Sequence, residues 1–537
     1  MSDNPLASSR TMALGTIASR GTGFLRTAVI AAALGPGLLG DAYNVANTTP
    51  NIVYELLLGG VLTSFVVPLL VAAAARDGDG GEAYGQRLLT LVTVGLTALS
   101  ALAVLAGPWI VRAYLHTCSP AQEHLATVFV RYFLPQILFY GVGATMGAIL
   151  NARGSFGAPM WAPVLNNVVV IGTGLAFLAI AHGHPQPGGL SSGQTALLGL
   201  GTTAGIVAQA IALIPSLRKT NFQLKWRLDF APGELSGAAR LAKWAFVYVI
   251  ANQVAYVIVV RLATGAAHCG SNGRASGFSP YAYAFQLFQL PHAVVAVSII
   301  TALLPRMSRH ATENRLDLVR ADVSTGWRSA AVLLVPASAG ALVLGPDLAV
   351  VLLGHGNTSV ADARYIGVVL ACFTVGLVPF SFFQLALRAF NAQQDARTPA
   401  LVNIGVNVVN LAADLLLYVV LPARIRVAGL ALGWAASYAF GLFLILRLLG
   451  RRIGGVDGRR VTRTSVRLAL AAVPAAVVAL LGMVIGHTVL GEGFSGALVA
   501  LVLGGGAGAV VFAATARRLR VAELSAVAGL LRARAGG

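Results

Sequence analysis

The sequence predicts an all-α polytopic membrane protein with about fourteen transmembrane helices. Two observations lead to this prediction. Of the 537 residues, 57% are hydrophobic and only 11% are charged, whereas about a quarter of the residues of a soluble protein are charged. Apolar runs long enough to cross a bilayer also recur from one end of the chain to the other.

Basic residues gather in alternate connections between these apolar runs. The formal net charge of +19 would suggest a nucleic-acid partner in a soluble chain. Here the arginines concentrate before the thirteenth run and after the last one, which is the positive-inside pattern of a membrane protein. We therefore expect no nucleic-acid partner, and both termini in the cytoplasm.

An internal repeat indicates two parallel halves. Asn151 and Asn391, about 240 residues apart, each lie at the end of an apolar run, and a proline follows each asparagine at the same spacing (Pro159 and Pro399). Such a repeat is typical of secondary transporters. It predicts two six-helix lobes around a central cavity, plus two C-terminal helices.

The predicted boundaries follow from this plan. They are an N-terminal lobe at 1–222, a cytoplasmic linker at 223–240, a C-terminal lobe at 241–450, the last two helices at 464–516 and a cytoplasmic tail at 517–537. The linker alternates apolar and polar residues, which favours an interfacial position. The last two helices carry no internal charge, so they should face lipid, hold a lipid chain or simply fill out the bundle.

The first two apolar runs are too polar for lipid. Six polar or small residues between Ser19 and Thr27, including Arg20 and Arg26, fall in a wedge about 160° wide on a helix. A second polar face, about 140° wide, extends from Asp41 to Glu55. A central arginine costs about 2.5–3.5 kcal/mol to insert, and a guanidinium fork matches phosphate. A cationic cavity for a phosphate-bearing ligand follows; ion pairing within the pair of helices is the alternative.

Candidate binding residues can be named from these patterns. For the substrate they are Arg20, Arg26, Asp41, Asn51, Glu55 and Arg261. In the eleventh apolar run, Asn407, Asn410 and Asp414 share a narrow stripe. Oxygen ligands around one carboxylate could bind Na⁺ or relay a proton, but interhelical hydrogen bonding explains membrane asparagines as well.

No catalytic set is visible in the sequence. It has no P-loop and no zinc-type histidine or cysteine spacing, so we expect no enzyme, metal or cofactor apart from optional ion coupling. Three cysteines do not form a disulfide framework. Cys118 and Cys269 both fall in predicted outer loops, but sequence alone cannot place them within bonding distance.

Several stretches together resemble the MurJ/MviN family of lipid II flippases, in the multidrug, oligosaccharidyl-lipid and polysaccharide exporter superfamily. They are Ser19-Arg20-Gly21-Thr22-Gly23-Phe24-Leu25-Arg26, Asp41-Ala42-Tyr43, Pro50-Asn51 through Pro68, Asn151-Ala152-Arg153 and Ala302-Leu303-Leu304-Pro305. The resemblance covers essentially all the predicted spans. It supports Arg20, Arg26 and Asp41 as functional residues.

The resemblance implies export of lipid II, the lipid-linked precursor of peptidoglycan, across the bacterial cytoplasmic membrane by alternating access. The membrane potential or an ion gradient would drive it, and the last two helices would hold the polyprenyl tail. The implied partners are a polyprenyl-diphosphate-linked saccharide, membrane lipids and proteins of cell-wall synthesis. Three residues depart from the family pattern: Tyr54 and Gln286 replace arginines, and Gly59 replaces a glutamate.

Three other functions remain open at this point. A polysaccharide-lipid flippase would share the cationic cavity. A drug or cation antiporter of the same superfamily would instead need acidic and aromatic residues in its cavity. A non-transporting scaffold for cell-wall machinery would need no charged cavity at all.

Overall fold

Helices are the regular elements throughout the part of the chain that the computed structural model describes, which comprises residues 5–55, 70, 79–181, 183, 185–229, 236–266 and 277–524. No strand occurs in these ranges, so the predicted all-α class is confirmed. The chain divides into two compact units, and the division falls just after Gly265. By their contacts, residues 241–265 therefore belong to the first unit, although the predicted C-terminal lobe begins at 241. The boundaries of the functional lobes stay a prediction.

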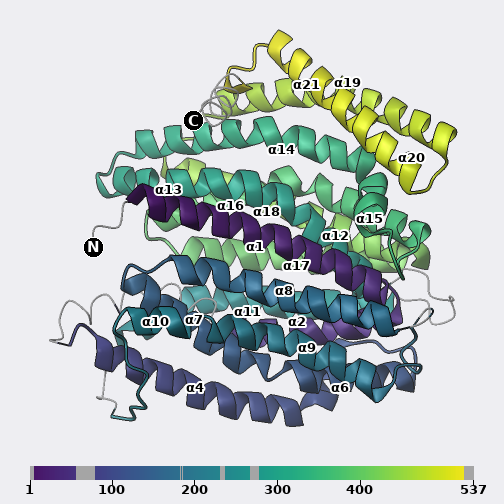
Figure 1. Cartoon of the computed structure of the whole chain (residues 1–537). Coiled ribbons are helices and arrows are strands. Elements are labelled where there is room, and N and C mark those ends of the chain that lie inside the picture. The colour runs from purple at the N-terminus through teal and green to yellow at the C-terminus, as the bar shows by residue number, and fades with distance from the viewer. Residues whose placement is uncertain are drawn as a thin grey trace. The chain divides into compact units, whose positions relative to one another are not determined.

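The first unit is a helical bundle. Its described helices are α1 (Pro5–Leu34), α2 (Leu38–Tyr54), α4 (Glu82–Leu105), α5 (Gly107–Tyr114), α6 (Pro120–Phe133), α7 (Gln136–Ala152), α8 (Gly157–Ile180), α9 (Ser192–Ile211), α10 (Ile214–Lys219) and α11 (Ser236–Gly265). Within this bundle α8 packs against both α1 and α9, and α2 packs on α6. Helix α4 packs mainly on α7 and lies at the edge of the unit (Figure 1).

The second unit is built around one long helix, α14. Its described elements are α12 (Phe278–Pro291), η3 (His292–Ala296), α13 (Val297–Thr312), α14 (Leu316–Leu353), α15 (Val360–Val375), α16 (Leu377–Ala392), α17 (Arg397–Val420), η4 (Ala423–Ile425), α18 (Arg426–Arg452), α19 (Gly458–Leu490), α20 (Phe494–Val499), η5 (Ala500–Gly505) and α21 (Gly506–Arg518). Helix α14 contacts α13, α15 and α19. At about 57 Å it is longer than the hydrocarbon core is thick.

The number of membrane spans is lower than predicted among the described residues. Eleven helices are long and apolar enough to cross a membrane, or twelve if the bent pair α15–α16 is one span. The predicted count of fourteen is therefore not confirmed. Helix α1, although about 45 Å long, is not among the eleven, and the residues that follow Glu55 lie outside the described ranges.

The repeated Asn-Ala endings form the same turn in both units. The Ser155 N–H donates to the Leu150 carbonyl (2.8 Å), and the Asp395 N–H donates to the Phe390 carbonyl (3.0 Å). The residue before each donor is left-handed, with φ of +74° at Gly154 and +58° at Gln394. This is the Schellman end of a helix, so the two Asn-Ala motifs have the same local conformation.

Glycines set the packing of the C-terminal hairpin formed by α19, α20, η5 and α21, whose two arms lie side by side (Figure 1). A Cβ on Gly482 would lie 2.4 Å from the backbone of Gly504, and one on Gly486 would lie 2.6 Å from the Gly496 carbonyl. Only glycine permits these approaches. The hairpin therefore has the small-residue packing that membrane helices use in place of a hydrophobic driving force.

Candidate functional site

Part of the predicted polar wedge of α1 is a helix contact rather than a wet surface. The Asn167 side-chain amide of α8 donates to the Ser19 carbonyl (3.1 Å) and to the Thr22 hydroxyl (3.0 Å). Thr27 is buried and donates to the carbonyl of Gly23. Asn167 thus attaches α8 to α1 through the Thr22 hydroxyl and the Ser19 backbone, while Thr27 bonds within its own helix.

The two arginines of α1 are the exception. Arg20 is exposed and Arg26 is half-buried. Within the described residues neither guanidinium is paired with a carboxylate, so the alternative of an ion pair with Asp41 or Glu55 is not what the structure has. Helix α1 thus carries two guanidinium groups without a carboxylate partner among the described residues.

Arg26 faces a polar aromatic group on neighbouring helices. Its charge acts on the hydroxyls of Tyr43 in α2 and Tyr140 in α7. The Tyr140 hydroxyl is hydrogen-bonded to Asn51, and its ring lies 5.5 Å from the ring of Tyr54. Tyr140 was not foreseen from the sequence, because an isolated tyrosine in an apolar run gives no signal of its neighbours.

The other predicted residues of α2 occupy different environments. Asp41 lies in the first turn of α2 and is only 1% exposed, where the helix dipole favours a negative charge. Asn51 and Glu55 are exposed at the opposite end of the helix. The predicted face thus has a buried acidic end and an accessible end.

Arg261 is engaged in a helix-terminus contact. Its guanidinium donates to the carbonyls of Arg112 (2.9 Å) and Ala113 (3.2 Å) at the end of α5. The last carbonyls of a helix have no partner within the helix, and basic side chains near a C-terminus satisfy them. The contact fixes α11 against α5, within the first unit.

The predicted ion site separates into two parts. The Asn407 amide donates to the Asn403 carbonyl of its own helix (2.9 Å). Asp414 is fully buried, and both of its carboxylate oxygens lack hydrogen-bond partners, as does the Asn410 side-chain oxygen one turn earlier. A Cβ on Gly433 of α18 would lie 2.1 Å from an Asp414 oxygen, so the carboxylate lies directly against the α18 backbone. Such orphaned oxygens fit a proton or a small cation.

The structure describes only some of the other residues that the sequence singled out. Gln286 is exposed on α12, while Gly59 and Cys269 lie outside the described residues. Cys118 is disulfide-bonded, and Cys372 is a free thiol. No group of three metal-ligating side chains occurs in the described ranges.

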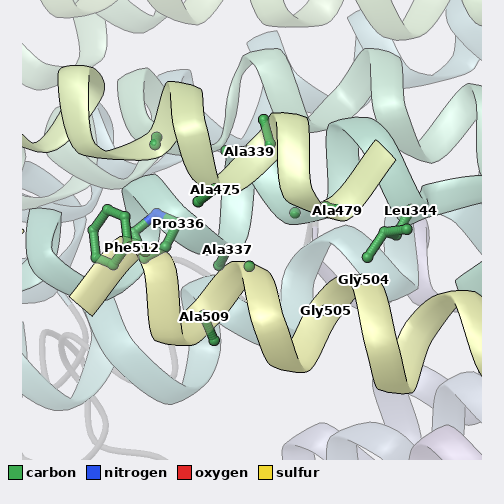
Figure 2. Close-up of a pocket in the computed structure, with 14 residues that line it drawn as sticks. Pro336, Ala337, Ala339, Leu344, Ala475, Ala479, Gly504, Gly505, Ala509 and Phe512 are labelled. Atoms are coloured by element: carbon green, nitrogen blue, oxygen red, sulfur yellow. The ribbon is translucent and has the colours of Figure 1, made fainter. Parts of the chain in front are cut away.

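An apolar cavity of about 270 Å³ lies where α14 meets the C-terminal hairpin. Figure 2 shows Pro336 and Leu344 of α14, Ala475 and Ala479 of α19, and Phe512 of α21 around it. The volume is slightly below that of a typical small-molecule pocket. The cavity suits a short length of hydrocarbon chain, and it lies in the helices that the sequence suggested for a lipid tail.

Solved structures of other proteins have a similar fold. One of them, described as lipid II flippase MurJ in an inward closed conformation, has a TM-score of 0.72 at 18% identity. The match covers 95% of this chain and 99% of that one. An inward-facing multidrug transporter of the MATE family has a TM-score of 0.68 at 14% identity, covering 82% and 95%. At these identities the likeness concerns the fold alone.

Sequence relatives are more specific. A probable lipid II flippase MurJ of Rhizobium meliloti (strain 1021) is 27% identical over 463 residues, covering 85% of this chain and 83% of the relative. The lipid II flippase MurJ of Burkholderia cenocepacia is 27% identical over 450 residues, covering 82% of each. A family model described as lipid II flippase MurJ matches residues 30–504. This multi-span membrane protein therefore belongs to the MurJ lipid II flippase family.

Proposed function

We propose that the chain is a lipid II flippase, which moves the polyprenyl-diphosphate-linked precursor of peptidoglycan from the cytoplasmic to the outer leaflet of the bacterial cytoplasmic membrane. The family match over residues 30–504 supports the activity. The observation that carries the binding site is the pair Arg20 and Arg26, which lack a carboxylate partner among the described residues. The half-buried charge of Arg26 needs a counter-charge, and a diphosphate would supply it to both arginines.

The surroundings of Arg26 suit the head of such a substrate. A guanidinium donates two parallel hydrogen bonds to a phosphate. Asn51 and Glu55 are exposed on α2, and amide and carboxylate groups can bind the hydroxyls of a sugar or the amides of a peptide. Asp41 is buried, so we propose that it supports the position of α2 rather than contacting the substrate. Arg261 supports α11 in the same way.

The apolar part of the substrate needs a separate place. The cavity between α14 and the C-terminal hairpin is lined by Ala, Gly, Pro, Leu and Phe side chains. We propose that it accommodates a segment of the polyprenyl tail. Its volume of about 270 Å³ limits that segment to a small part of a long chain, and the remainder would stay in lipid.

Alternating access of two lobes is the mechanism that we propose. Each elementary charge that crosses 100 mV is worth about 2.3 kcal/mol. With both termini in the cytoplasm, an anionic substrate leaves a negative interior downhill, and an empty cationic site returns downhill. Asp414 offers a second coupling element, since its orphaned oxygens would take up a proton or Na⁺ in one state.

A complementation experiment tests the activity. The chain is expressed in bacteria whose own lipid II export can be switched off, and lipid II at the outer surface is measured. We expect restored export and growth. Export of a different polyprenyl-linked saccharide without lipid II would replace the proposal with the polysaccharide-lipid alternative, and membrane insertion without any export would support a scaffold.

A further inference from the structure

The segment Phe222–Asp229, called the strap below, connects α10 to the chain that leads into α11. It has no helical structure; it runs extended along α4. Phe222 anchors its start: the ring is buried, a Cβ on Gly85 would lie 2.9 Å from it, and the Arg153 guanidinium lies 5.0 Å from its centre. The strap is therefore a built element of the first unit.

Side chains of α4 hold the strap backbone at a regular spacing. The Gln223 N–H donates to a Glu82 carboxylate oxygen (3.0 Å), and Gln86 donates its amide to the Gln223 carbonyl (2.8 Å). Four residues further along the strap, the Arg227 N–H donates to the Thr90 hydroxyl (3.1 Å). From Gln223 to Arg227 the extended strap advances about 13 Å, and from Glu82 to Thr90 the helix advances about 12 Å. The two contact points are therefore about equally far apart on the strap and on α4.

The outward side of the strap is apolar. Leu224, Trp226 and Leu228 are 44%, 72% and 73% exposed. Leu91 and Val94 of α4, which follow the last strap contact at Thr90, are exposed as well. Exposed apolar side chains grouped in this way mark an interaction surface.

Charges fix the level of these apolar side chains relative to the bilayer. Lys225 is exposed and Arg227 is half-buried between the three apolar side chains. Arg87 of α4 forms an ion pair with Asp229 (3.2 Å), and the hydrogen bond from Arg87 holds the pKa of Asp229 below its usual range. An ion pair and a free lysine belong in the headgroup region, while Leu91 and Val94 belong in hydrocarbon.

We propose that the strap is an interfacial anchor, which inserts Leu224, Trp226 and Leu228 into the headgroup region of the leaflet on the basic side of the protein and places Lys225 among anionic headgroups. Tryptophan prefers this region, and lysine near it gains from negative lipid charge. Because the strap backbone donates to α4, insertion also fixes the end of this otherwise lipid-exposed helix. The proposal does not depend on which substrate the protein moves.

Quenching of Trp226 fluorescence tests the proposal. The full chain is reconstituted in vesicles of phosphatidylcholine and phosphatidylglycerol that carry bromine either near the glycerol end of the acyl chain or near its terminus. The contribution of Trp226 is the difference between the wild type and Trp226→Phe. We expect this contribution to be quenched about twofold or more by shallow bromine, less by deep bromine, and hardly at all by aqueous iodide.

Trp434→Phe is the matched control, since Trp434 is 9% exposed in the second unit and its contribution should resist all three quenchers. Quenching of Trp226 by iodide but by neither bromine position would overturn the proposal, because the strap would then project into water as a surface for a soluble protein. Equal or stronger quenching by deep bromine would also overturn it.

Discussion

The pair α1–α8 and the C-terminal hairpin solve the same packing problem in opposite ways. The hairpin brings backbones together through Gly482, Gly486 and Gly504, and its contact contains no internal charge. Helix α1 instead relies on hydrogen bonds from Asn167, and it keeps two arginines that have no carboxylate partner in the part of the chain that the structure describes. The difference teaches that polar residues explained by helix contacts should be set aside before a binding site is assigned. What remains in α1 is Arg20 and Arg26.

The largest expected effect concerns the polar contact that attaches the hairpin to α14 and α15. His487 of α19 is hydrogen-bonded to the buried Asp347 of α14 (2.7 Å), and Arg364 of α15 lies 3.8 Å from the same oxygen. Asp347→Ala should destabilise the protein by about 3–5 kcal/mol, because removing one partner leaves uncompensated buried charge. Thermal unfolding in detergent measures this.

Asp317→Ala is the control for that substitution, since Asp317 is 67% exposed and its pair with Arg315 is long (3.5 Å). Its effect should be below about 1 kcal/mol. Equal effects at Asp347 and Asp317 would show that the hairpin is held by its glycine contacts alone.

The second prediction breaks the glycine packing itself. Gly482→Ala places a methyl group 2.4 Å from the Gly504 backbone, and overpacking of this kind costs about 1–3 kcal/mol. Gly506→Ala is the matched control, because a Cβ there meets nothing within 4 Å and alanine favours a helix. A Gly482→Ala protein as stable as the control would mean that the two arms separate without cost.

The third prediction tests the hydrogen-bonded contact between α8 and α1. Asn167→Leu removes two hydrogen bonds between α8 and α1, and such bonds are worth about 0.6 kcal/mol each on average in membrane proteins. We expect a loss of about 1 kcal/mol in unfolding experiments. Gln393→Leu, whose amide donates only to Ala389 in its own helix, should have a smaller effect; the reverse order would contradict the assignment.

The smallest effect is a dependence on pH at the repeated turn of the second unit. Burial raises the pKa of Asp395, but hydrogen bonds from Thr398 and from Arg452 outweigh it, and the pKa lies below its usual value. The carboxylate therefore stabilises the fold at neutral pH, and this contribution is lost as the pH falls from about 3.9 through the lowered pKa. Asp395→Asn should reduce stability at neutral pH and flatten the acid side of the profile.

The sequence predicted the helical class because it depends on local hydropathy and periodicity, while the two-lobe plan drawn from the repeat stays a prediction. The site was harder. Arg20 and Arg26 were identified by the cost of placing them in a membrane, but Thr22 shared their wedge and proved to be a packing residue, since a helical wheel does not show that Asn167 lies opposite. Arg261 looked equally polar, and only its contact with the end of α5 reveals another role. Tyr140 could not be found, because its importance comes from neighbours on other helices.

Export by an Arg26→Gln protein is the measurement that tests the central claim most directly. Hydrogen bonds to charged groups contribute about 1.5–3 kcal/mol each, so the account predicts a loss of export of about tenfold or more, with Arg26→Lys intermediate because lysine keeps the charge without the fork. Arg459→Gln, at an exposed position in the first turn of α19, should export normally. Wild-type levels of surface lipid II from a fully expressed Arg26→Gln protein would contradict the claim that this arginine binds the diphosphate.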